Sequence, residues 1–360
     1  MALLRTPLFE SHVALGARIV EFGGWDMPVQ YSNGVLAEHS AVRQGVGMFD
    51  VSHMGRIRLT GENAGGALDR VVTSNVGALR VGRARYGLIC NESGGILDDV
   101  VVMRLADDEF LMVCNAASWD RITDWLGRHC EGVSIGHERD ETSMMAVQGP
   151  GAVEALQALV DIELGDVGRF ACRAVTVAGT SGLLSRTGYT GEDGFEVIVP
   201  AGEAARLWQT LVDERGVAPC GLAARDVLRL EAGLMLYGQD MDDTVTPLEA
   251  GLDRFVNLDK DFLGVGALRA QAEQGVERRI TGLTVEGRSA PRHGYTVRTA
   301  DGRGSVVTSG AYSPVLGYGV ALAYLPIDVT EPGNVVDVDI RGRTVQATTV
   351  PLPFLQANRG

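Results

Sequence analysis

The chain of 360 residues contains only five cysteines, an odd number, and no two of them have C-x-x-C spacing. Several lie within apolar runs such as 111–114, which is typical of buried thiols in a reducing compartment. The five are Cys90, Cys114, Cys130, Cys172 and Cys220. The sequence therefore predicts neither a disulfide framework nor a zinc site.

Positive charge and long apolar runs are also scarce. The net charge of −14 disfavours duplex nucleic acid as a partner, because binding to phosphates requires a basic surface. Docking of an acidic protein would need a local basic patch. No apolar run approaches the roughly 18 residues of a membrane-spanning helix. Residues 1–8 are too short and too polar for a signal peptide. We therefore expect no nucleic acid and no membrane as partners, and a cytoplasmic location.

The motifs of several enzyme classes are missing. No G-x-G-x-x-G sequence opens a helix after a strand, and no phosphate loop with Gly-Lys-Ser/Thr occurs. His137 is not followed by the second histidine of a zinc motif. The segment 132–136 matches the nucleophile-elbow pattern, but charged residues follow it where an apolar helix is required. These absences argue against nucleotide, metal and acyl-serine chemistry.

The pattern of apolar residues indicates an α+β chain with more than one domain. Its length exceeds what a single core usually covers. The order strand, glycine-rich loop, strand, helix with tryptophan occurs around Trp119 and again around Trp208, roughly 90 residues later. Aromatic residues mixed with glycine and proline over 6–31 predict a loop, and 262–274 predicts a helix that ends at Gly275.

Beyond that helix the apolar period changes to two, with short strands and Gly or Pro turns, which is typical of a β-barrel or sandwich. We predict a duplicated α+β unit whose two glycine-rich loops could meet across one cavity. The predicted domains are 1–275, built from two interleaved α+β domains (about 1–50 with 140–275, and 51–139), and a C-terminal β-barrel domain, 276–360.

Two adjacent carboxylates, Asp98 and Asp99, follow a Gly-Gly turn and precede the apolar run 100–102. Successive side chains on a strand point to opposite faces, so we expect the two carboxylates to lie in different environments. A carboxylate that points inward is costly unless it has a partner, and such residues are frequent at catalytic sites. A turn Asp followed by an edge-strand Asp would have the same spacing, and spacing alone leaves both interpretations open.

Five polar residues on glycine-rich segments suit a flat heterocycle: Tyr86, Asp99, Tyr189, Glu196 and Arg225. A glutamate can accept two parallel hydrogen bonds from an amino-pyrimidinone, and an arginine offers a fork of donors for a carbonyl or carboxylate. The alternative is that 189–194 forms an ordinary turn with solvated acids. A further residue, His53, beside Ser and Asp, is more typical of a structural hydrogen-bonding residue than of a general base.

Seven sequence motifs carry a family resemblance. They are RTPLF from residue 5, FGGWDMPVQY from 22, FDVSHMG from 49, GGILDD from 94, RTGYTGEDGFE from 186, GLAARDVLRLEAG from 221 and LMLYGQDM from 234. In this order they resemble the aminomethyltransferases, the T-proteins of the glycine cleavage system. The resemblance runs from residue 5 to about 355. It implies three domains around a central folate cleft, with tetrahydrofolate as co-substrate and no metal or nucleotide.

The implied reaction moves the methylene carbon of the aminomethyl-lipoyl arm of H-protein to tetrahydrofolate. The products are 5,10-methylenetetrahydrofolate, ammonia and dihydrolipoyl H-protein. The catalytic aspartate of the family falls on Asp99. The implied folate contacts are Met54, Tyr86, Asp99, Val101, Val113, Asn115, Tyr189, Glu196 and Arg225.

The chain departs from some relatives at three places. Arg254 stands where some have Trp, Arg169-Phe170 stands where some have a tyrosine pair, and 358–360 lacks a C-terminal Tyr. These differences concern the contacts to the folate tail and to H-protein. Two related functions stay open, a stand-alone folate-dependent demethylase and a non-catalytic folate-binding protein that supports iron–sulfur assembly. The Lys-Gly-Cys-x-Thr-Gly-Gln-Glu motif of the latter does not occur here.

Overall fold

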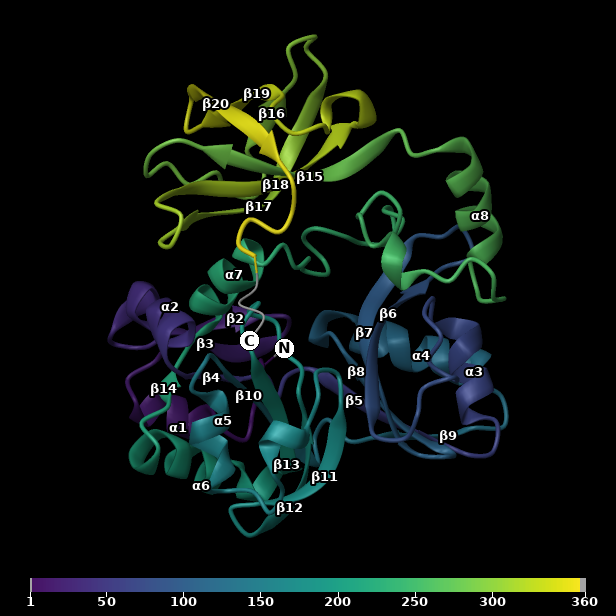
Figure 1. The fold of residues 1–360 in the computed structure, drawn as a ribbon, viewed down its shortest axis with the longest axis vertical. Helices are drawn as coiled ribbons and strands as arrows, with labels where there is room; N and C mark the ends of the chain where they lie inside the picture. Colours follow the sequence, from purple (N-terminus) through teal and green to yellow (C-terminus); the bar gives the residue numbers. More distant parts are fainter. Residues whose placement is uncertain (1, 357–360) are drawn as a thin grey trace. The chain divides into compact units, whose positions relative to one another are not determined.

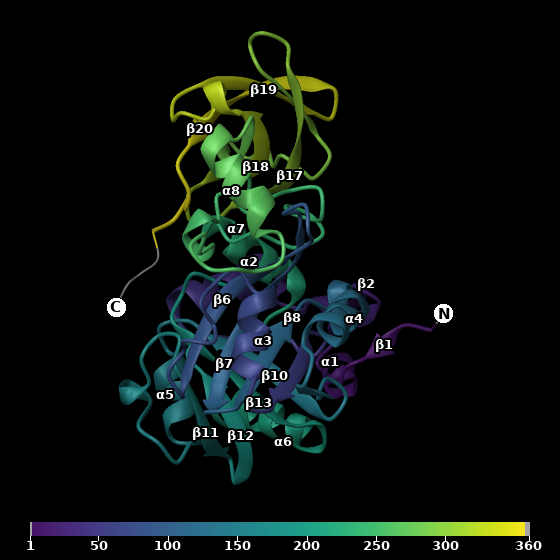
Figure 2. The same ribbon diagram turned by 90° about the vertical axis from the view of Figure 1, so that its right-hand side faces the viewer.

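The computed structural model describes residues 2–356, which form two compact units (Figures 1 and 2). Unit 1 contains the residues up to Gly87 together with Asp98–Asp226. Unit 2 contains Leu88–Leu97 together with the residues from Val227 onward. This division does not follow the predicted domain boundaries, which stay predictions.

The N-terminal segment is regular, so the prediction of a loop over 6–31 is wrong. It contains β1 (Leu4–Arg5), α1 (Phe9–Ala14), β2 (Arg18–Phe22) and β3 (Trp25–Gln30). The last two strands pair antiparallel and β1 joins them in parallel. Gly23 and Gly24 form the hairpin turn with φ of 57° and 86°, which glycine adopts without steric cost. The Gly-Gly pair therefore marks a tight turn between two strands.

A six-stranded sheet holds the main apolar core of unit 1. Its order is β11-β12-β13-β10-β4-β14. The strands are β4 (Gly47–Asp50), β10 (Thr142–Gln148), β11 (Cys172–Val177), β12 (Thr180–Ser185), β13 (Gly194–Pro200) and β14 (Ala218–Pro219). The accompanying helices are α2 (Gly34–Gln44), α5 (Ala152–Gln157) and α6 (Ala204–Gln209). Phe195 from β13 and Trp208 from α6 are both buried in this core. The second predicted tryptophan thus anchors a helix to its sheet.

A five-stranded sheet has the order β6-β7-β8-β5-β9. Its strands are β5 (Gly55–Thr60), β6 (Arg83–Cys90), β7 (Ile96–Ala106), β8 (Glu109–Cys114) and β9 (Ser134–His137). The helices α3 (Ala64–Val71) and α4 (Trp119–His129) follow β5 and β8 in the chain. The segment 132–136 runs into β9 and not into a helix, which agrees with a chance match to the nucleophile elbow.

Unit 2 carries the C-terminal barrel, which confirms the predicted α+β region followed by a β-barrel. The helix α8 (Val265–Gln274) ends at Gly275, as predicted, whereas α7 (Leu222–Glu231) spans the boundary between the units. The strands close in the order β15-β18-β17-β16-β19-β20. They are β15 (Arg278–Val285), β16 (Thr296–Arg298), β17 (Gly304–Ser313), β18 (Tyr318–Pro326), β19 (Val335–Ile340) and β20 (Arg343–Val350).

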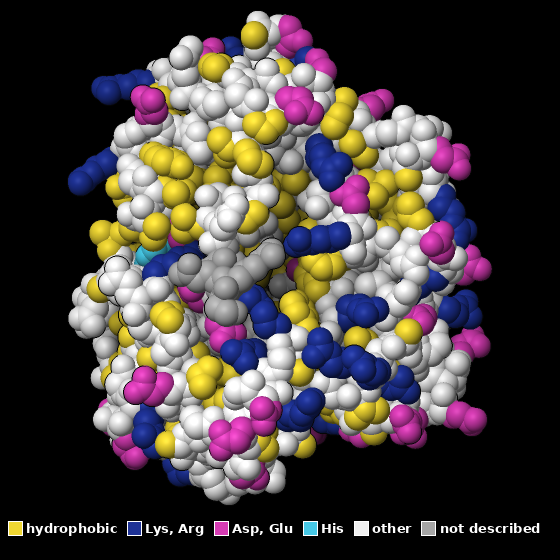
Figure 3. Space-filling view, viewed as in Figure 1, with side chains coloured by type: hydrophobic (Ala, Val, Ile, Leu, Met, Phe, Trp, Pro, Cys, Tyr) yellow, Lys and Arg dark blue, Asp and Glu magenta, His cyan; other side chains and the backbone are white. Residues whose placement is uncertain are grey.

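The surface carries charge of both signs. Over unit 1, Figure 3 shows Lys and Arg side chains gathered on the drawn face. The segments 80–85 and 169–173 lie side by side, since the Ala84 amide donates to the Phe170 carbonyl at 2.8 Å. Their exposed arginines are Arg80, Arg85, Arg169 and Arg173. A local basic surface therefore exists despite the net charge of −14.

All five cysteines are buried and free. Within residues 2–356, no helix has the length and apolar character needed to cross a membrane.

Candidate active site

Asp98 and Asp99 lie on β7, directly after the Gly-Gly turn, and a single side chain contacts both. The Asn115 Nδ2 atom is 2.7 Å from Asp98 Oδ1 and 2.7 Å from Asp99 Oδ1. The prediction that the two carboxyls occupy separate environments is therefore wrong. Asn115 follows the end of β8, the strand paired with β7, and there its amide reaches around the strand edge to both carboxyls.

The carboxyl of Asp98 is the more deeply buried of the two, since the residue is completely inaccessible to solvent. The Ser118 hydroxyl donates to Asp98 Oδ2 at 2.5 Å, and the Asn115 backbone amide donates to the same oxygen at 3.1 Å. These two residues precede α4, where Asn or Ser was predicted to cap the helix. Neither makes a side-chain cap bond there, because both side chains bind Asp98.

Asp99 is only half-buried and has a second partner on the neighbouring strand β6. The Tyr86 hydroxyl donates to Asp99 Oδ2 at 3.1 Å. Burial, together with the charge of Asp99 and their hydrogen bond, raises the pKa of Tyr86 well above its ordinary value. Tyr86 therefore stays protonated and acts as a fixed donor to the carboxylate.

Burial also raises the pKa of both carboxyls. For Asp98 the charge of Asp99 adds to this effect, while the bonds from Ser118 and Asn115 oppose it. For Asp99 the bonds from Tyr86 and Asn115 oppose the effect of burial. Perturbed carboxyl pairs of this kind are frequent at catalytic sites.

A second cluster joins Tyr189, Glu196 and Arg225. The Arg225 guanidinium lies 4.9 Å from the Tyr189 ring centroid, in cation–π geometry. Glu196 on β13 is buried and accepts a hydrogen bond from the Thr187 hydroxyl. Burial raises the pKa of Glu196, whereas Thr187 and the charge of Arg225 lower it. The turn 189–194 therefore leads into a buried acid next to a buried cation, which excludes the alternative of fully solvated acids.

Arg225 offers an unsatisfied donor. Its Nη1 atom is buried and has no hydrogen-bond partner among residues 2–356. Burial lowers the pKa of its guanidinium, while the charges of Glu196 and Tyr189 raise it. A buried donor without a partner costs about 1–3 kcal/mol, so the atom is suited to a ligand acceptor.

The two clusters neighbour each other within unit 1. Tyr189 acts electrostatically on Tyr86, which in turn binds Asp99. The carboxyl pair, the two tyrosines, the arginine and the buried glutamate thus form one continuous set of polar groups. Five of the predicted site residues belong to this set: Tyr86, Asp99, Tyr189, Glu196 and Arg225.

The apolar site residues also lie near Asp99. Val101 is two positions along β7 from Asp99, and it faces Val113 of β8 across the sheet. Arg56 on β5 pairs with Val113 in register. Met54 precedes β5, and its carbonyl accepts a hydrogen bond from the Arg56 guanidinium.

Arg56 is a positioning residue that the sequence did not reveal. It is completely buried, and its guanidinium donates to the carbonyls of Ser52, Met54, Arg139 and Thr142 and to the Thr142 hydroxyl. It therefore fixes the turn before β5 to the turn before β10. No sequence motif marks this role, because its partners are mostly backbone carbonyls.

His53 does not act as the structural hydrogen-bonding residue that was predicted, at least through Nδ1. This atom is buried and has no partner among residues 2–356. Burial lowers the pKa of His53 to about 4, with the charges of Arg225 and Arg56 acting in the same direction and Asp50 opposing. The ring packs edge-on against Phe22 at 5.7 Å. A neutral imidazole therefore lies close to Arg225.

A Tyr31–His12–Asp50 chain elsewhere in unit 1 resembles a catalytic relay in its order. The Tyr31 hydroxyl is 2.9 Å from His12 Nδ1, and His12 Nε2 is 2.9 Å from Asp50 Oδ2. The Thr6 hydroxyl donates to the same oxygen at 2.6 Å. His12 and Asp50 have no solvent-accessible side-chain surface. The chain therefore links three segments of the core and offers no surface to a substrate.

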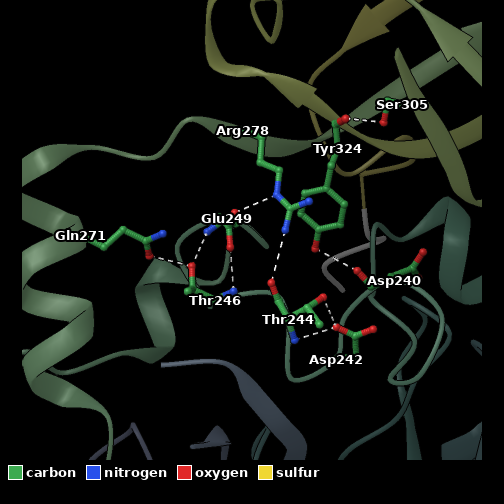
Figure 4. A network of polar contacts seen from close by, with 9 residues as sticks. All are labelled: Asp240, Asp242, Thr244, Thr246, Glu249, Gln271, Arg278, Ser305 and Tyr324. Carbon is green, nitrogen blue, oxygen red and sulfur yellow. Dashed lines mark hydrogen bonds and ion pairs between the residues drawn. The ribbon is translucent and has the colours of Figure 1, made fainter. Parts of the chain in front are cut away.

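Unit 2 has a separate polar network around Tyr324, drawn in Figure 4. The Tyr324 hydroxyl donates to the Asp240 carbonyl at 2.8 Å, and Arg278 donates to Glu249 at 2.8 Å and to the Thr244 carbonyl at 3.3 Å. Arg278, Glu249 and Tyr324 also line a hollow of about 940 Å³. Because these polar groups bind one another, they form a structural network and not a second reactive site.

The three departures from relatives have different surroundings. Arg254 lies over the Phe255 ring at 4.6 Å. Phe170 is 41% exposed and has a φ of 53°, which is rare for a bulky residue. The predicted loss of a C-terminal Tyr at 358–360 lies outside the described residues.

Comparison with known proteins identifies the family. Residues 8–260 match the GCVT N-terminal domain, and residues 278–356 match the glycine cleavage T-protein C-terminal barrel domain. The aminomethyltransferase of Saccharopolyspora erythraea is 47% identical over 362 residues, covering 98% of each chain. That of Rubrobacter xylanophilus is 48% identical over 361 residues, covering 99% of this chain and 95% of the relative.

A solved structure agrees with this assignment. The crystal structure of glycine cleavage system aminomethyltransferase T from Bartonella henselae has a TM-score of 0.93, with 33% identity and 99% of each chain covered. Both the sequence matches and the fold therefore extend over the whole chain. This chain belongs to the glycine cleavage T-protein family of aminomethyltransferases.

Proposed function

We propose that this aminomethyltransferase takes the methylene carbon from the aminomethyl-lipoyl arm of H-protein and transfers it to tetrahydrofolate. Ammonia, dihydrolipoyl H-protein and 5,10-methylenetetrahydrofolate leave as products. The proposed location is the cytoplasm, which suits five unpaired thiols. The reaction needs no oxidant, because the carbon keeps its oxidation state while its bonds to sulfur and nitrogen are exchanged.

The observation that carries this proposal is the continuity of the Asp99–Tyr86 pair with the Tyr189–Arg225–Glu196 cluster. A reduced pterin has a donor-rich amino-pyrimidinone edge and a carbonyl. Glu196 would accept from the edge, and the free Arg225 Nη1 would donate to the carbonyl. Tyr189 and Tyr86 would flank the ring system.

The remaining members of the proposed folate site line the same sheet. Val101 and Val113 form an apolar cross-strand pair beside Asp99. Met54 lies at the start of β5, held through its carbonyl by Arg56. Asn115 Nδ2 is bound to the carboxylates, so only its Oδ1 atom, which accepts no bond within residues 2–356, is left for the folate.

In the proposed mechanism the ionised Asp99 acts on the folate nitrogen that receives the carbon. It either takes a proton there or stabilises the positive charge of the iminium as it forms. General-base assistance contributes about 10²–10⁴-fold, and preorganised charge can contribute similarly. Most of the remaining acceleration comes from holding the nitrogen against the lipoyl-borne carbon.

The proposal is tested by mixing the protein with synthetic aminomethyl-lipoylated H-protein and tetrahydrofolate and measuring ammonia release. We expect release that depends on both partners, with a matching yield of 5,10-methylenetetrahydrofolate. Unlipoylated H-protein is the control. Tetrahydrofolate binding without ammonia release would contradict the proposal and would favour a non-catalytic folate-binding protein.

A further inference from the structure

The Asn115 amide has two N–H groups, and the structure uses both on carboxylates. Asp98 Oδ1 and Asp99 Oδ1 are each 2.7 Å from Asn115 Nδ2. Side chains of consecutive strand residues normally point apart, so these two carboxyls would separate without a shared partner. Asn115 therefore holds the Asp99 carboxyl in a direction that the strand alone would not fix.

No cation neutralises this pair. Among residues 2–356, neither Asp98 nor Asp99 forms an ion pair with a lysine, arginine or histidine, and all of their side-chain partners are neutral donors. Two carboxylates held by one amide, with one of them completely buried, repel each other in a medium of low polarity. Ionisation of both is therefore far more costly than ionisation of one.

The surroundings of Asp98 offer a place for a proton. Ser118 Oγ is 2.5 Å from Asp98 Oδ2 and 3.0 Å from the Asn115 carbonyl. If the hydroxyl donates to the carbonyl, its lone pair can accept a proton carried by Asp98. If Asp98 is ionised, the hydroxyl turns and donates to the carboxylate. Ser118 thus accommodates both states of Asp98 without leaving a polar group unpaired.

We propose that Asp98 and Asn115 are positioning residues for Asp99, and that the two carboxyls together hold one proton and present a single negative charge. Asn115 aims the charge and Asp98 limits it to one unit. The part of this proposal that concerns the substrate rests on the proposed function, since a single fixed charge suits a transient iminium. The pairing itself depends only on the geometry.

Other titratable groups next to the pair would not obscure its titration. Tyr86 on β6 and Cys114 on β8 both act electrostatically on Asp98. Burial is the main cause that raises the pKa of each well above its ordinary value, so both stay neutral over the range in which carboxyls titrate. Arg56 and Arg139 act on Cys114 and keep their charge over this range.

Carboxyl ¹³C NMR titration of the full chain with labelled aspartate tests the pairing without substrate. In the wild type we expect two linked steps separated by at least about one pH unit. Asp98→Asn and Asp99→Asn should each leave a single step that lies between these two. Asp107→Asn is the matched control, because that side chain is 96% exposed in the turn of the same hairpin. It should leave both steps unchanged.

Independent single steps for Asp98 and Asp99 that are the same in the wild type and in both Asn variants would overturn the pairing. Should Asp98→Asn fail to fold, as judged by circular dichroism, Asp99→Asn decides the question from the other partner. This test is independent of the proposed reaction, so a coupled titration in a protein that releases no ammonia would leave the pairing intact and sink only the proposed function.

Kinetics test the positioning role. With aminomethylated H-protein and tetrahydrofolate, Asn115→Ala should lower kcat by about 10–100-fold, because the carboxylate loses its aim. The KM for tetrahydrofolate should change by less than about threefold. Asp98→Asn should keep the acidic limb of the pH profile and lose the decline that accompanies the second ionisation of the pair. A raised KM with unchanged kcat in Asn115→Ala would make Asn115 a folate contact only and would overturn its positioning role.

Discussion

The His53 imidazole lies next to two arginines and has no bond at Nδ1 within the described chain. Burial is the main cause that lowers its pKa to about 4, below the ordinary value of 6.5. The folded protein therefore resists protonation of this ring, whereas the unfolded chain accepts the proton. The stability that this difference contributes is present above about pH 6.5 and is lost as the pH falls through about 4.

Replacing this histidine should remove part of the acid sensitivity. Between pH 7 and pH 5, the shift in the pKa of His53 costs the wild type about 2 kcal/mol of unfolding free energy. We expect His53→Gln to lose less than the wild type by about this amount. Urea denaturation at both pH values measures the difference. Equal losses in the two proteins would show that His53 titrates normally.

The sequence identified the polar residues of the site better than it identified their partners. Asp99, Tyr86, Tyr189, Glu196 and Arg225 come from glycine-rich motifs and lie in one cluster. Their roles stay predictions. The Asn115 bridge and the Ser118 bond could not be predicted, because they depend on the register of β7 with β8 across a span of 16 to 20 residues.

At the scale of elements, the N-terminal end of α7 approaches the backbone of β3 closely. A Cβ atom at Gly221 would lie 2.4 Å from the Val29 carbonyl carbon and 2.6 Å from the Gln30 nitrogen. Backbone atoms cannot move as a flexible side chain can. Gly221 therefore lets the helix that carries Arg225 begin against the strand.

Gly221→Ala should destabilise unit 1 by about 1–3 kcal/mol, the usual cost of overpacking. Gly202→Ala is the matched control, since a Cβ there would meet nothing within 4 Å. Urea denaturation followed by circular dichroism measures both variants. A Gly221→Ala protein as stable as the control would mean that α7 and β3 can separate without cost.

Elements with a strong apolar period were predictable, and elements defined by turns were less so. The helix before Gly275 and the barrel strands follow their periodicity. The β2–β3 hairpin was missed because Gly23 and Gly24 were taken as loop residues. At α4 the predicted cap failed for a tertiary reason, since the Asn115 and Ser118 side chains bind Asp98 and not the helix amides.

At the scale of the whole molecule, unit 2 contains a buried ion pair that the barrel domain depends on. Arg229 and Asp240 have side-chain exposures of 1% and 0%, and their charged atoms are 2.5 Å apart. Arg229 also donates to the Ser309 hydroxyl at 2.6 Å, which connects α7 to β17. Removal of either partner leaves an uncompensated charge in the interior.

Asp240→Leu should therefore cost about 3–5 kcal/mol of unfolding free energy. The double variant Arg229→Met with Asp240→Leu should be more stable than Asp240→Leu alone, because no unpaired charge is left. The control Asp328→Leu breaks an exposed pair with Arg303 and should cost at most about 1 kcal/mol. Equal stabilities of Asp240→Leu and the control would contradict a structural role for the buried pair.

The sequence predicted the order of the large parts of the molecule, an α+β region and then a barrel, because apolar periods report on local structure. It did not predict that Leu88–Leu97 groups with the residues after Val227. That grouping depends on long-range bonds such as the one from the Ile96 amide to the Val245 carbonyl at 2.9 Å. No local pattern encodes such a contact.

The central claim of this account is that Asp99 carries the chemistry while the neighbouring groups bind the folate. It is tested most directly by Asp99→Asn, assayed for ammonia release with aminomethylated H-protein and for tetrahydrofolate binding by titration calorimetry. We predict that binding stays within a few-fold of the wild type, about 1 kcal/mol, while turnover falls by about 10²–10⁴-fold. Turnover within a few-fold of the wild type would contradict the account.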